Sequence, residues 1–142
     1  GFYLDADATT MRITGDGPIA SRLEGSLPKL FGSARGGMRY RMFRGDLDLH
    51  LYVQVRAWSA FRSRTLHTPT GLLILPEEGA DELDPSSTIG VYVEAGVREA
   101  TIFIAWENLA AGTPLMEGNM TVPVYPLPEQ ALRFGVFWPI WD

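Results

Sequence analysis

Hydrophobic and polar residues alternate along much of the chain, in short segments separated by glycine and proline. The longest such segment is residues 46–57, in which every second residue is apolar. Because successive side chains of a strand point to opposite faces, this segment predicts a long strand with one core-facing side. That side carries Leu47, Leu49, Leu51, Val53, Val55 and Ala57, opposite Asp46, Asp48, His50, Tyr52, Gln54 and Arg56.

Further segments show the same period, or a short apolar run bounded by turn residues. They are residues 38–43, 70–75, 88–94, 99–106, 119–125 and 131–138. No segment keeps the 3.6-residue period of a long helix. Sequential strands without crossover helices are typical of antiparallel architectures, so we expect an all-β sandwich or barrel of about seven strands.

The first 30 residues follow a different pattern. They are rich in glycine and proline and contain few large apolar residues after Leu4. We therefore expect residues 1–30 to form an extended arm that lies against another surface, with one helical turn at 20–24. The β-sandwich would occupy residues 31–142, and a chain of 142 residues fits a single domain.

Composition and charge narrow the function classes. The hydrophobic fraction of 46% excludes wholesale disorder, and the absence of cysteine excludes disulfides and thiolate metal sites. No apolar run approaches the roughly 20 residues of a membrane span, so no membrane anchor is expected. A net charge of −5 argues against a dedicated nucleic-acid binder.

Candidate catalytic and ligand-binding motifs are few. Asp46, Asp48 and His50 share one face of a predicted strand and have the side chains of a metal site. The solvent face of an amphipathic strand explains them without any metal, and we prefer that interpretation. Arg44-Gly45-Asp46 spells the tripeptide that integrins bind, and we expect the strand beginning at Asp46 to hold it extended. A nucleophile elbow and a phosphate loop are both missing from the sequence. We expect no enzyme activity, no cofactor and no metal.

Aromatic and arginine residues point instead to a buried interface. Seven arginines lie between positions 35 and 64, and the chain contains a single lysine. A nucleotide-composition bias in the coding genome would produce the same preference for arginine. Arginine and the large aromatic residues are enriched in protein interfaces. We expect subunit contacts at Arg56, Trp58, Phe61, Arg62, Arg64, Trp138 and Trp141.

The order of the segments resembles a known family. F-R-G-D-L-D-L-H-L at residues 43–51 is similar to a strand in the capsid proteins of picornaviruses and their dicistrovirus, iflavirus and algal relatives. Residues 71–79, 95–108, 118–125 and 132–138 resemble later strands of those proteins in the same order, so the resemblance covers residues 31–142. The chain carries Ala105 where the family has proline, and it is shorter than the family's usual subunit.

This resemblance implies a viral jelly roll, an antiparallel eight-stranded sandwich of two four-stranded sheets. It implies a structural capsid protein of a small non-enveloped positive-sense RNA virus. The partners would be homologous subunits of an icosahedral shell, with the RNA genome contacted at most indirectly and a host receptor that the sequence does not identify. The location would be the virion, and the host cytoplasm during assembly.

Two other functions fit parts of the pattern. A carbohydrate-binding β-sandwich module would present exposed tryptophans as stacking platforms. A cupin-like metalloenzyme would need a cluster of histidines with a carboxylate, and the two histidines, His50 and His67, lie on different segments.

Overall fold

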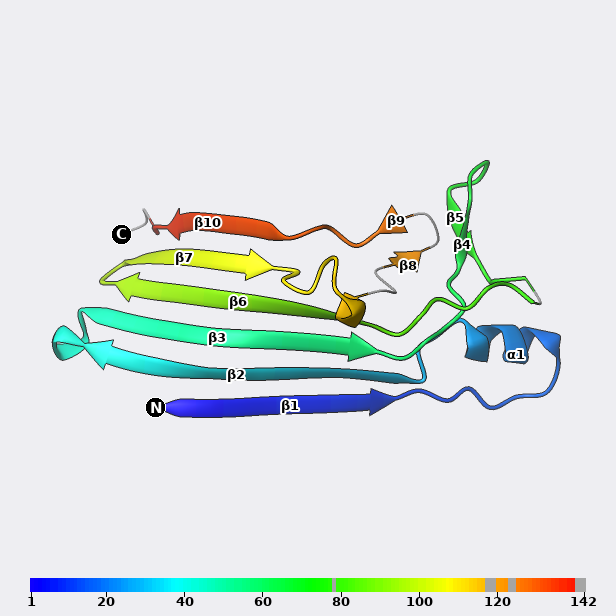
Figure 1. The fold of residues 1–142 in the computed structure, drawn as a ribbon, viewed down its shortest axis with the longest axis horizontal. Helices are drawn as coiled ribbons and strands as arrows, with labels where there is room; N and C mark the ends of the chain where they lie inside the picture. The colour runs from blue at the N-terminus through cyan, green and yellow to red at the C-terminus, as the bar shows by residue number, and fades with distance from the viewer. Residues whose placement is uncertain (78, 117–119, 123–124, 140–142) are drawn as a thin grey trace.

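The computed structural model describes residues 1–77, 79–116, 120–122 and 125–139. Six of its strands form one antiparallel sheet (Figure 1). In order across the sheet, these strands are β1 (Phe2–Thr10), β2 (Leu30–Met42), β3 (Leu47–Trp58), β6 (Ser86–Val97), β7 (Ala100–Glu107) and β10 (Ala131–Phe137).

Short elements connect these strands. Helix α1 (Pro18–Gly25) lies between β1 and β2, with its proline in the first turn, where the missing N–H is not needed. The other connecting elements are β4 (Thr65–His67), β5 (Leu72–Ile74), β8 (Met120–Val122), β9 (Tyr125–Pro126) and the 3₁₀ turns η1 (Phe43–Gly45) and η2 (Pro114–Met116). Among the described residues, no helix has the length and apolar character needed to cross a membrane.

The structure confirms the all-β, antiparallel prediction but not the expected pair of four-stranded sheets. The described strands form one six-stranded sheet and two separate two-stranded sheets, β4–β5 and β8–β9. The reason lies in the connections, because each large strand lies beside the next large strand along the chain. After the β4–β5 excursion the chain returns to the free edge of β3, and after β8–β9 it returns to β7.

The strand predicted at residues 46–57 is confirmed as β3, and the helical turn predicted at 20–24 lies within α1. The arm expected at residues 1–30 needs correction, because residues 2–10 pair along their whole length with β2 as an edge strand. Phe2 and Leu4 alternate there with Tyr3 and Asp5, which is the two-residue period of a strand. The alternation that indicates a strand was present in the sequence, but it extends over only a few residues.

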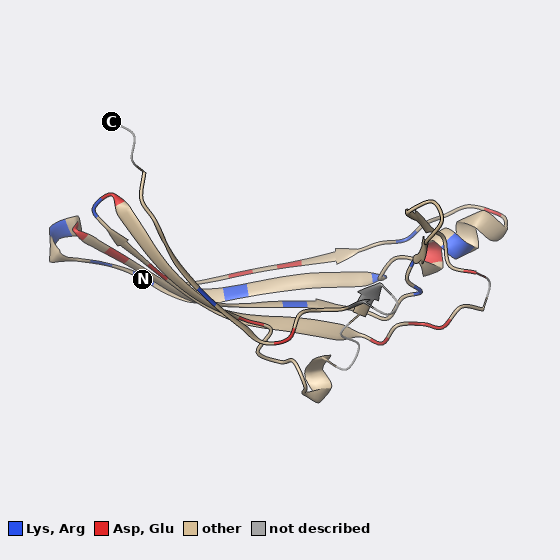
Figure 2. Cartoon of the chain, turned by 90° about the horizontal axis from the view of Figure 1, so that it is seen from above, with Lys and Arg blue, Asp and Glu red and all other residues tan. Residues whose placement is uncertain are grey.

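One face of the large sheet is apolar from edge to edge. The register aligns one row across all six strands: Phe2, Met38, Leu51, Val93, Ile104 and Phe134. The next row contains Leu4, Gly36, Val53, Val91, Trp106 and Leu132. No described element covers these rows, and Figure 2 shows the sheet as a single twisted layer. Ile104 is 47% exposed and Phe134 is 80% exposed.

The chain accordingly has almost no core of its own. In the described part, the buried apolar side chains are Phe61, Pro76, Ala105, Ala110 and Met116. The accessible surface is 10413 Å², whereas a compact protein of 15.7 kDa has about 7,300 Å². The excess of about 3,000 Å² means that the fold leaves surface open that a compact monomer buries.

Candidate functional site

The opposite face of the sheet is polar and aromatic. It contains the alternate residues of the same strands, among them Asp48, His50 and Tyr52 on β3. Strand β3 lies between β2 and β6, so the neighbours of these residues come from those two strands. Facing residues of paired strands lie about 4.5–5.5 Å apart, close enough for their side chains to interact. This face therefore brings together side chains that are far apart in the sequence.

Four rings form a continuous row on this face, which we call the aromatic ladder: Tyr3, His50, Tyr52 and Tyr92. The ring centroids of Tyr3 and His50 are 5.6 Å apart, and those of His50 and Tyr52 are 4.7 Å apart. Tyr52 and Tyr92 stack at 4.7 Å with an angle of 10° between their planes. The guanidinium of Arg35 lies 5.0 Å from the centre of the Tyr52 ring. The ladder thus ties β1, β2, β3 and β6 together.

Both ring nitrogens of His50 are engaged. The Tyr3 hydroxyl lies 2.7 Å from Nε2, and a carboxylate oxygen of Glu94 lies 3.3 Å from Nδ1. The consistent assignment has Nδ1–H donating to Glu94 and Tyr3 donating to Nε2. Because neither nitrogen faces an open position, His50 serves in this arrangement as a link between three strands rather than as a base for a ligand.

The carboxylate of Glu94 also organises Tyr52. The Tyr52 hydroxyl donates to Glu94 Oε1 at 3.1 Å. Partial burial, reinforced by the negative charge of Glu94, raises the pKa of Tyr52 to about 12, because both disfavour the phenolate. Tyr52 therefore stays protonated well beyond the usual range of a tyrosine.

A close approach of the backbone makes room for the ladder at Gly37. A β-carbon at this position would overlap the carbonyl oxygen of Leu51 and lie 2.7 Å from the β-carbon of Tyr52 and 2.9 Å from the Tyr3 hydroxyl. Real β-carbons do not come this close to their neighbours. Glycine at this position therefore allows Tyr3 to cross β2 and reach His50.

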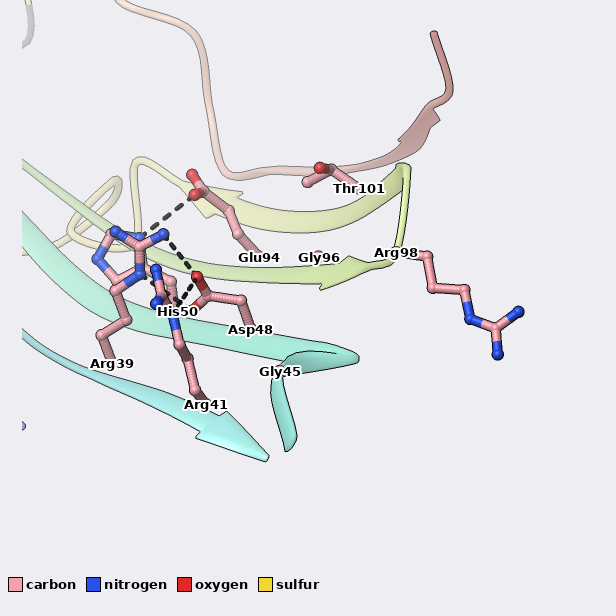
Figure 3. A pocket seen from close by; sticks show the side chains of 9 residues that line it. All are labelled: Arg39, Arg41, Gly45, Asp48, His50, Glu94, Gly96, Arg98 and Thr101. Carbon is pink, nitrogen blue, oxygen red and sulfur yellow. Dashed lines mark hydrogen bonds and ion pairs between the residues drawn. The ribbon is translucent and has the colours of Figure 1, made fainter. Parts of the chain in front are cut away.

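A polar cavity of about 410 Å³ lies beside the ladder, towards the β2–β3 and β6–β7 turns (Figure 3). Arg39 donates two hydrogen bonds to the Asp48 carboxylate, at 3.0 and 2.8 Å, and Arg41 lies 3.5 Å from the same group. The hydrogen bond from Arg39 lowers the pKa of Asp48. The charges that line this cavity largely satisfy one another, while the Arg98 side chain points away from the cluster (Figure 3).

The structure also shows the surroundings of the metal-type residues singled out in the sequence. Asp48 is ion-paired with Arg39, and His50 is held by Tyr3 and Glu94. Asp46 lies outside β3, in the turn that precedes it. Within the described part of the chain, no group of three potential ligands lies close enough together to hold a metal ion.

The Arg44-Gly45-Asp46 tripeptide was predicted to be extended, and this prediction is wrong. It forms an exposed tight turn between β2 and β3, in which the Asp46 N–H donates to the Phe43 carbonyl at 3.2 Å. Arg44 has φ 60° and Gly45 has φ 108°, the left-handed values that a tight turn requires. The need to reverse the chain between two paired strands outweighs the tendency of Asp46 to extend β3.

A second cavity, of about 340 Å³, lies at the other end of the polar face, and we call it the aromatic pocket. Three of the predicted interface residues meet here, since Arg56, Trp58 and Phe61 all line the pocket. Phe31, opposite Trp58 across the β2–β3 ladder, contributes another wall. Pro28, Thr88 and Leu127 complete a lining that is mostly apolar.

The other predicted interface residues are dispersed. Arg62 and Arg64 are exposed beside Phe61, and the Arg62 N–H donates to the Gly25 carbonyl at 2.8 Å. Trp138 follows β10 and is 67% exposed, at the opposite end of the sheet from the aromatic pocket. Trp141 lies outside the described residues.

Sequence reasoning missed most of the ladder. Tyr3 was assigned to an arm, and Tyr92 and Glu94 were taken as the polar side of an ordinary strand. The available signal was the two-residue period itself, because His50 and Tyr52 on one strand and Tyr92 and Glu94 on another both occupy polar-face positions. Only the register shows that these positions face each other.

Searches of known family models, curated proteins and solved structures found no match to this chain.

Proposed function

We propose that this chain is a structural subunit of an icosahedral viral capsid, which assembles with homologous subunits around an RNA genome. The observation that carries the proposal is the apolar face that spans six strands and is left open by the chain's own elements. Large contiguous apolar surfaces on soluble proteins mark interaction sites. A protein that functions alone would need to cover this one.

The amount of open surface fits repeated contacts. Six strands about 4.8 Å apart and about 30 Å long give an apolar face of about 800 Å². One side of a standard protein interface has about the same area. The total excess of about 3,000 Å² over a compact monomer corresponds to several such half-interfaces, which suits a subunit with neighbours on several sides.

The resemblance to capsid jelly rolls supplies the finer fold that we propose. In that fold a second antiparallel sheet packs face to face on the first, at a spacing of about 10 Å. The open rows through Leu51 and Val53 would then form one wall of the sandwich core. The polar face with the aromatic ladder would be the outer surface of the sandwich.

The polar face favours protein contacts over direct binding of RNA. Several of its arginines lie beside carboxylates, as in the pairs Arg39–Asp48 and Arg133–Glu107. A surface neutralised in this way lacks the excess positive charge that attracts phosphate backbones. The arrangement is consistent with a shell subunit that meets the genome at most indirectly.

In the carbohydrate-binding alternative, the tryptophans would have to form an exposed row on one face of the sheet. Trp58 lies on the polar face and lines the aromatic pocket, whereas Trp106 lies on the apolar face. These positions favour the shell role, because they place the two rings on opposite sides of the sheet.

The test is assembly. The chain is expressed together with its neighbouring coding sequence, and the product is characterised by sedimentation and negative-stain imaging. Uniform icosahedral particles are expected. A monomer that stays dispersed at high concentration, and that binds an immobilised polysaccharide panel, would overturn the proposal in favour of the carbohydrate-binding module.

A further inference from the structure

We propose that the aromatic pocket of one copy receives the Trp138 side chain of a second copy, in a head-to-tail contact. This inference rests on the proposed shell function and deepens it by naming a partner and the residues that join the two chains. The occupant is a second copy because the chain carries both an open aromatic-lined pocket and an exposed tryptophan that cannot reach it.

The pocket has the size and chemistry for one large aromatic side chain. Its volume is about 340 Å³, at the lower end of the range for ligand sites. Phe31, Trp58 and Phe61 supply ring surfaces, and Pro28 and Leu127 close the sides. Aromatic rings pack favourably against one another in offset or edge-to-face arrangements.

Two residues that line the pocket, Trp58 and Arg56, have polar groups without a partner in the described part of the chain. The indole nitrogen of Trp58 is buried without a hydrogen-bond acceptor among the described residues. Arg56 lines the same pocket without an ion pair in the described part of the chain. A guanidinium next to a docked indole gains a cation–π contact.

The segment after β10 has the properties of an anchor. Phe137 is 66% exposed and Trp138 is 67% exposed. Pro139 follows and restricts the residue before it to extended conformations, which reduces the entropy that Trp138 loses when it docks.

Trp138 cannot fill the pocket of its own chain. The register places Phe137 in one row with Thr101, Gly96 and Asp48, at one end of the sheet. Trp58 marks the other end of β3, ten residues from Asp48, which is about 33 Å along the strand. The segment therefore reaches only a neighbour. A contact between two different surfaces of the same chain is heterologous, and it builds rings or extended arrays rather than closed pairs.

The first experiment uses the full chain with Ile104→Asp, which places a charge on the apolar face, one strand in from the β10 edge, and blocks association through that face. In this background, sedimentation velocity at increasing concentration is expected to show head-to-tail oligomers. Trp138→Ala removes the anchor, and Leu127→Asp spoils the pocket from a loop without touching the sheet. Each is expected to lower the association constant at least about tenfold, because aromatic anchors dominate interface energy. Ile19→Ala, which trims an equally exposed apolar side chain on α1, is the matched control and is expected to change nothing.

Mixing the two variants is the decisive step. The Trp138→Ala chain keeps an intact pocket and the Leu127→Asp chain keeps an intact anchor, so one good contact can form between them. The mixture is expected to give dimers and no larger species. Unchanged association in both single variants, or no dimer in the mixture, overturns the proposal.

A peptide provides a second readout that needs no oligomer. The probe is a capped peptide that copies residues 134–139 with three serines added for solubility, and its control has alanine in place of Trp138. The Trp138→Ala chain, whose pocket is free, is immobilised for biolayer interferometry. The contact is supported if the control peptide binds at least about tenfold more weakly than the probe. The probe itself should lose as much affinity when the immobilised chain also carries Phe31→Ala. Equal binding of both peptides overturns it.

These results are independent of the shell role itself. If particles form and the mixed variants give no dimer, the head-to-tail contact is wrong and the shell function stands. If the dimer forms and no particle does, the contact stands and the shell function fails.

Discussion

The two faces of the sheet have the same backbone but opposite needs. On the polar face, Asp48, His50 and Tyr52 each find a partner on a neighbouring strand. On the apolar face, large side chains of the same sheet remain open to water. Val53, for example, remains 43% exposed at the middle of the sheet.

The difference shows which interactions a single layer can complete. Hydrogen bonds, ion pairs and ring stacking form within the layer, between side chains on adjacent strands. Burial of apolar surface needs a second layer, because water reaches every side chain of an open face. The polar face therefore stabilises the sheet from within, and the apolar face stabilises it only when something covers it.

The largest expected effect comes from a charge on the apolar face. Ile104→Asp places a carboxylate at a position that is 47% exposed in the single chain, so the chain itself loses little. In an assembly that covers this face, the carboxylate would be buried without a partner. A cost of several kcal/mol per contact is then expected. Sedimentation of the co-expressed subunits should show that particles are lost.

The neighbouring residue provides the control for this prediction. Phe103 is adjacent on β7 but lies on the polar face, where it faces Gly135 across the ladder. Phe103→Asp introduces the same charge one residue away and is expected to leave assembly in place. If both variants assemble equally well, the apolar face is not a contact surface.

The next largest effect is expected on the free energy of unfolding, when two adjacent glycines on opposite faces of the sheet, Gly37 and Gly36, are each replaced by alanine. Gly37→Ala places a methyl group too close to the Leu51 carbonyl oxygen, the Tyr52 β-carbon and the Tyr3 hydroxyl on the polar face. Overpacking of this kind costs about 1–3 kcal/mol. Gly36→Ala puts the same group on the open apolar face, where the nearest atom is a Leu4 methyl at 3.5 Å. Its expected effect is neutral or a gain of about 0.4–1 kcal/mol from a stiffer unfolded chain.

Urea unfolding of both glycine variants in an Ile104→Asp, Trp138→Ala background, which blocks both proposed contacts, measures the two free energies of unfolding. Equal losses for the two glycine variants would mean that Tyr3 does not cross β2 in the way described.

The sequence predicts the individual strands far better than their arrangement. Residues 46–57 alternate over their whole length, and the strand follows from that alone. The division into sheets depends on which strands pair, and a two-residue period carries no information about the partner of a strand. Residues 2–10 illustrate the limit, since a short alternation ahead of a glycine- and proline-containing segment was too weak to separate an edge strand from an arm.

The same limit applies to the candidate sites: some residues could be selected from the sequence, but contacts between strands could not. Arg56, Trp58 and Phe61 were selected by residue type, and the turn after β3 brings them together at one pocket. The aromatic ladder was not predicted, because Tyr3 and Tyr92 become neighbours of β3 only through the register of two further strands. Local composition can identify a residue suited to an interface, but contacts across strands require the pairing.

A smaller effect is expected at alkaline pH, and it concerns the polar face alone. The pKa of Tyr52 rises from 10.0 to about 12 in the folded chain, so folding disfavours the phenolate. The stabilising contribution is complete below the pKa of an unfolded tyrosine and is lost as the pH rises from 10 through about 12. Urea midpoints between pH 9 and 12 should therefore fall less steeply in Tyr52→Phe than in the parent chain. Tyr40→Phe, on the apolar face, should keep the parent slope.

The smallest effect is expected at acid pH, from an ion pair near the edge of the polar face. The hydrogen bond from Arg39 holds the pKa of Asp48 below its ordinary value of 3.8. Its contribution is therefore present above the pKa of the unfolded carboxyl and is lost as the pH falls through the lower folded value. Asp48→Asn should flatten the decline of the urea midpoint below about pH 4, whereas Asp46→Asn, in the exposed turn, should not. Because the Arg39 side chain is 61% exposed, salt screens the pair, and 0.5 M sodium chloride should shrink the difference between the two variants. A difference that survives high salt would mean that the pair is shielded from solvent, and then the polar face too would have a covering partner.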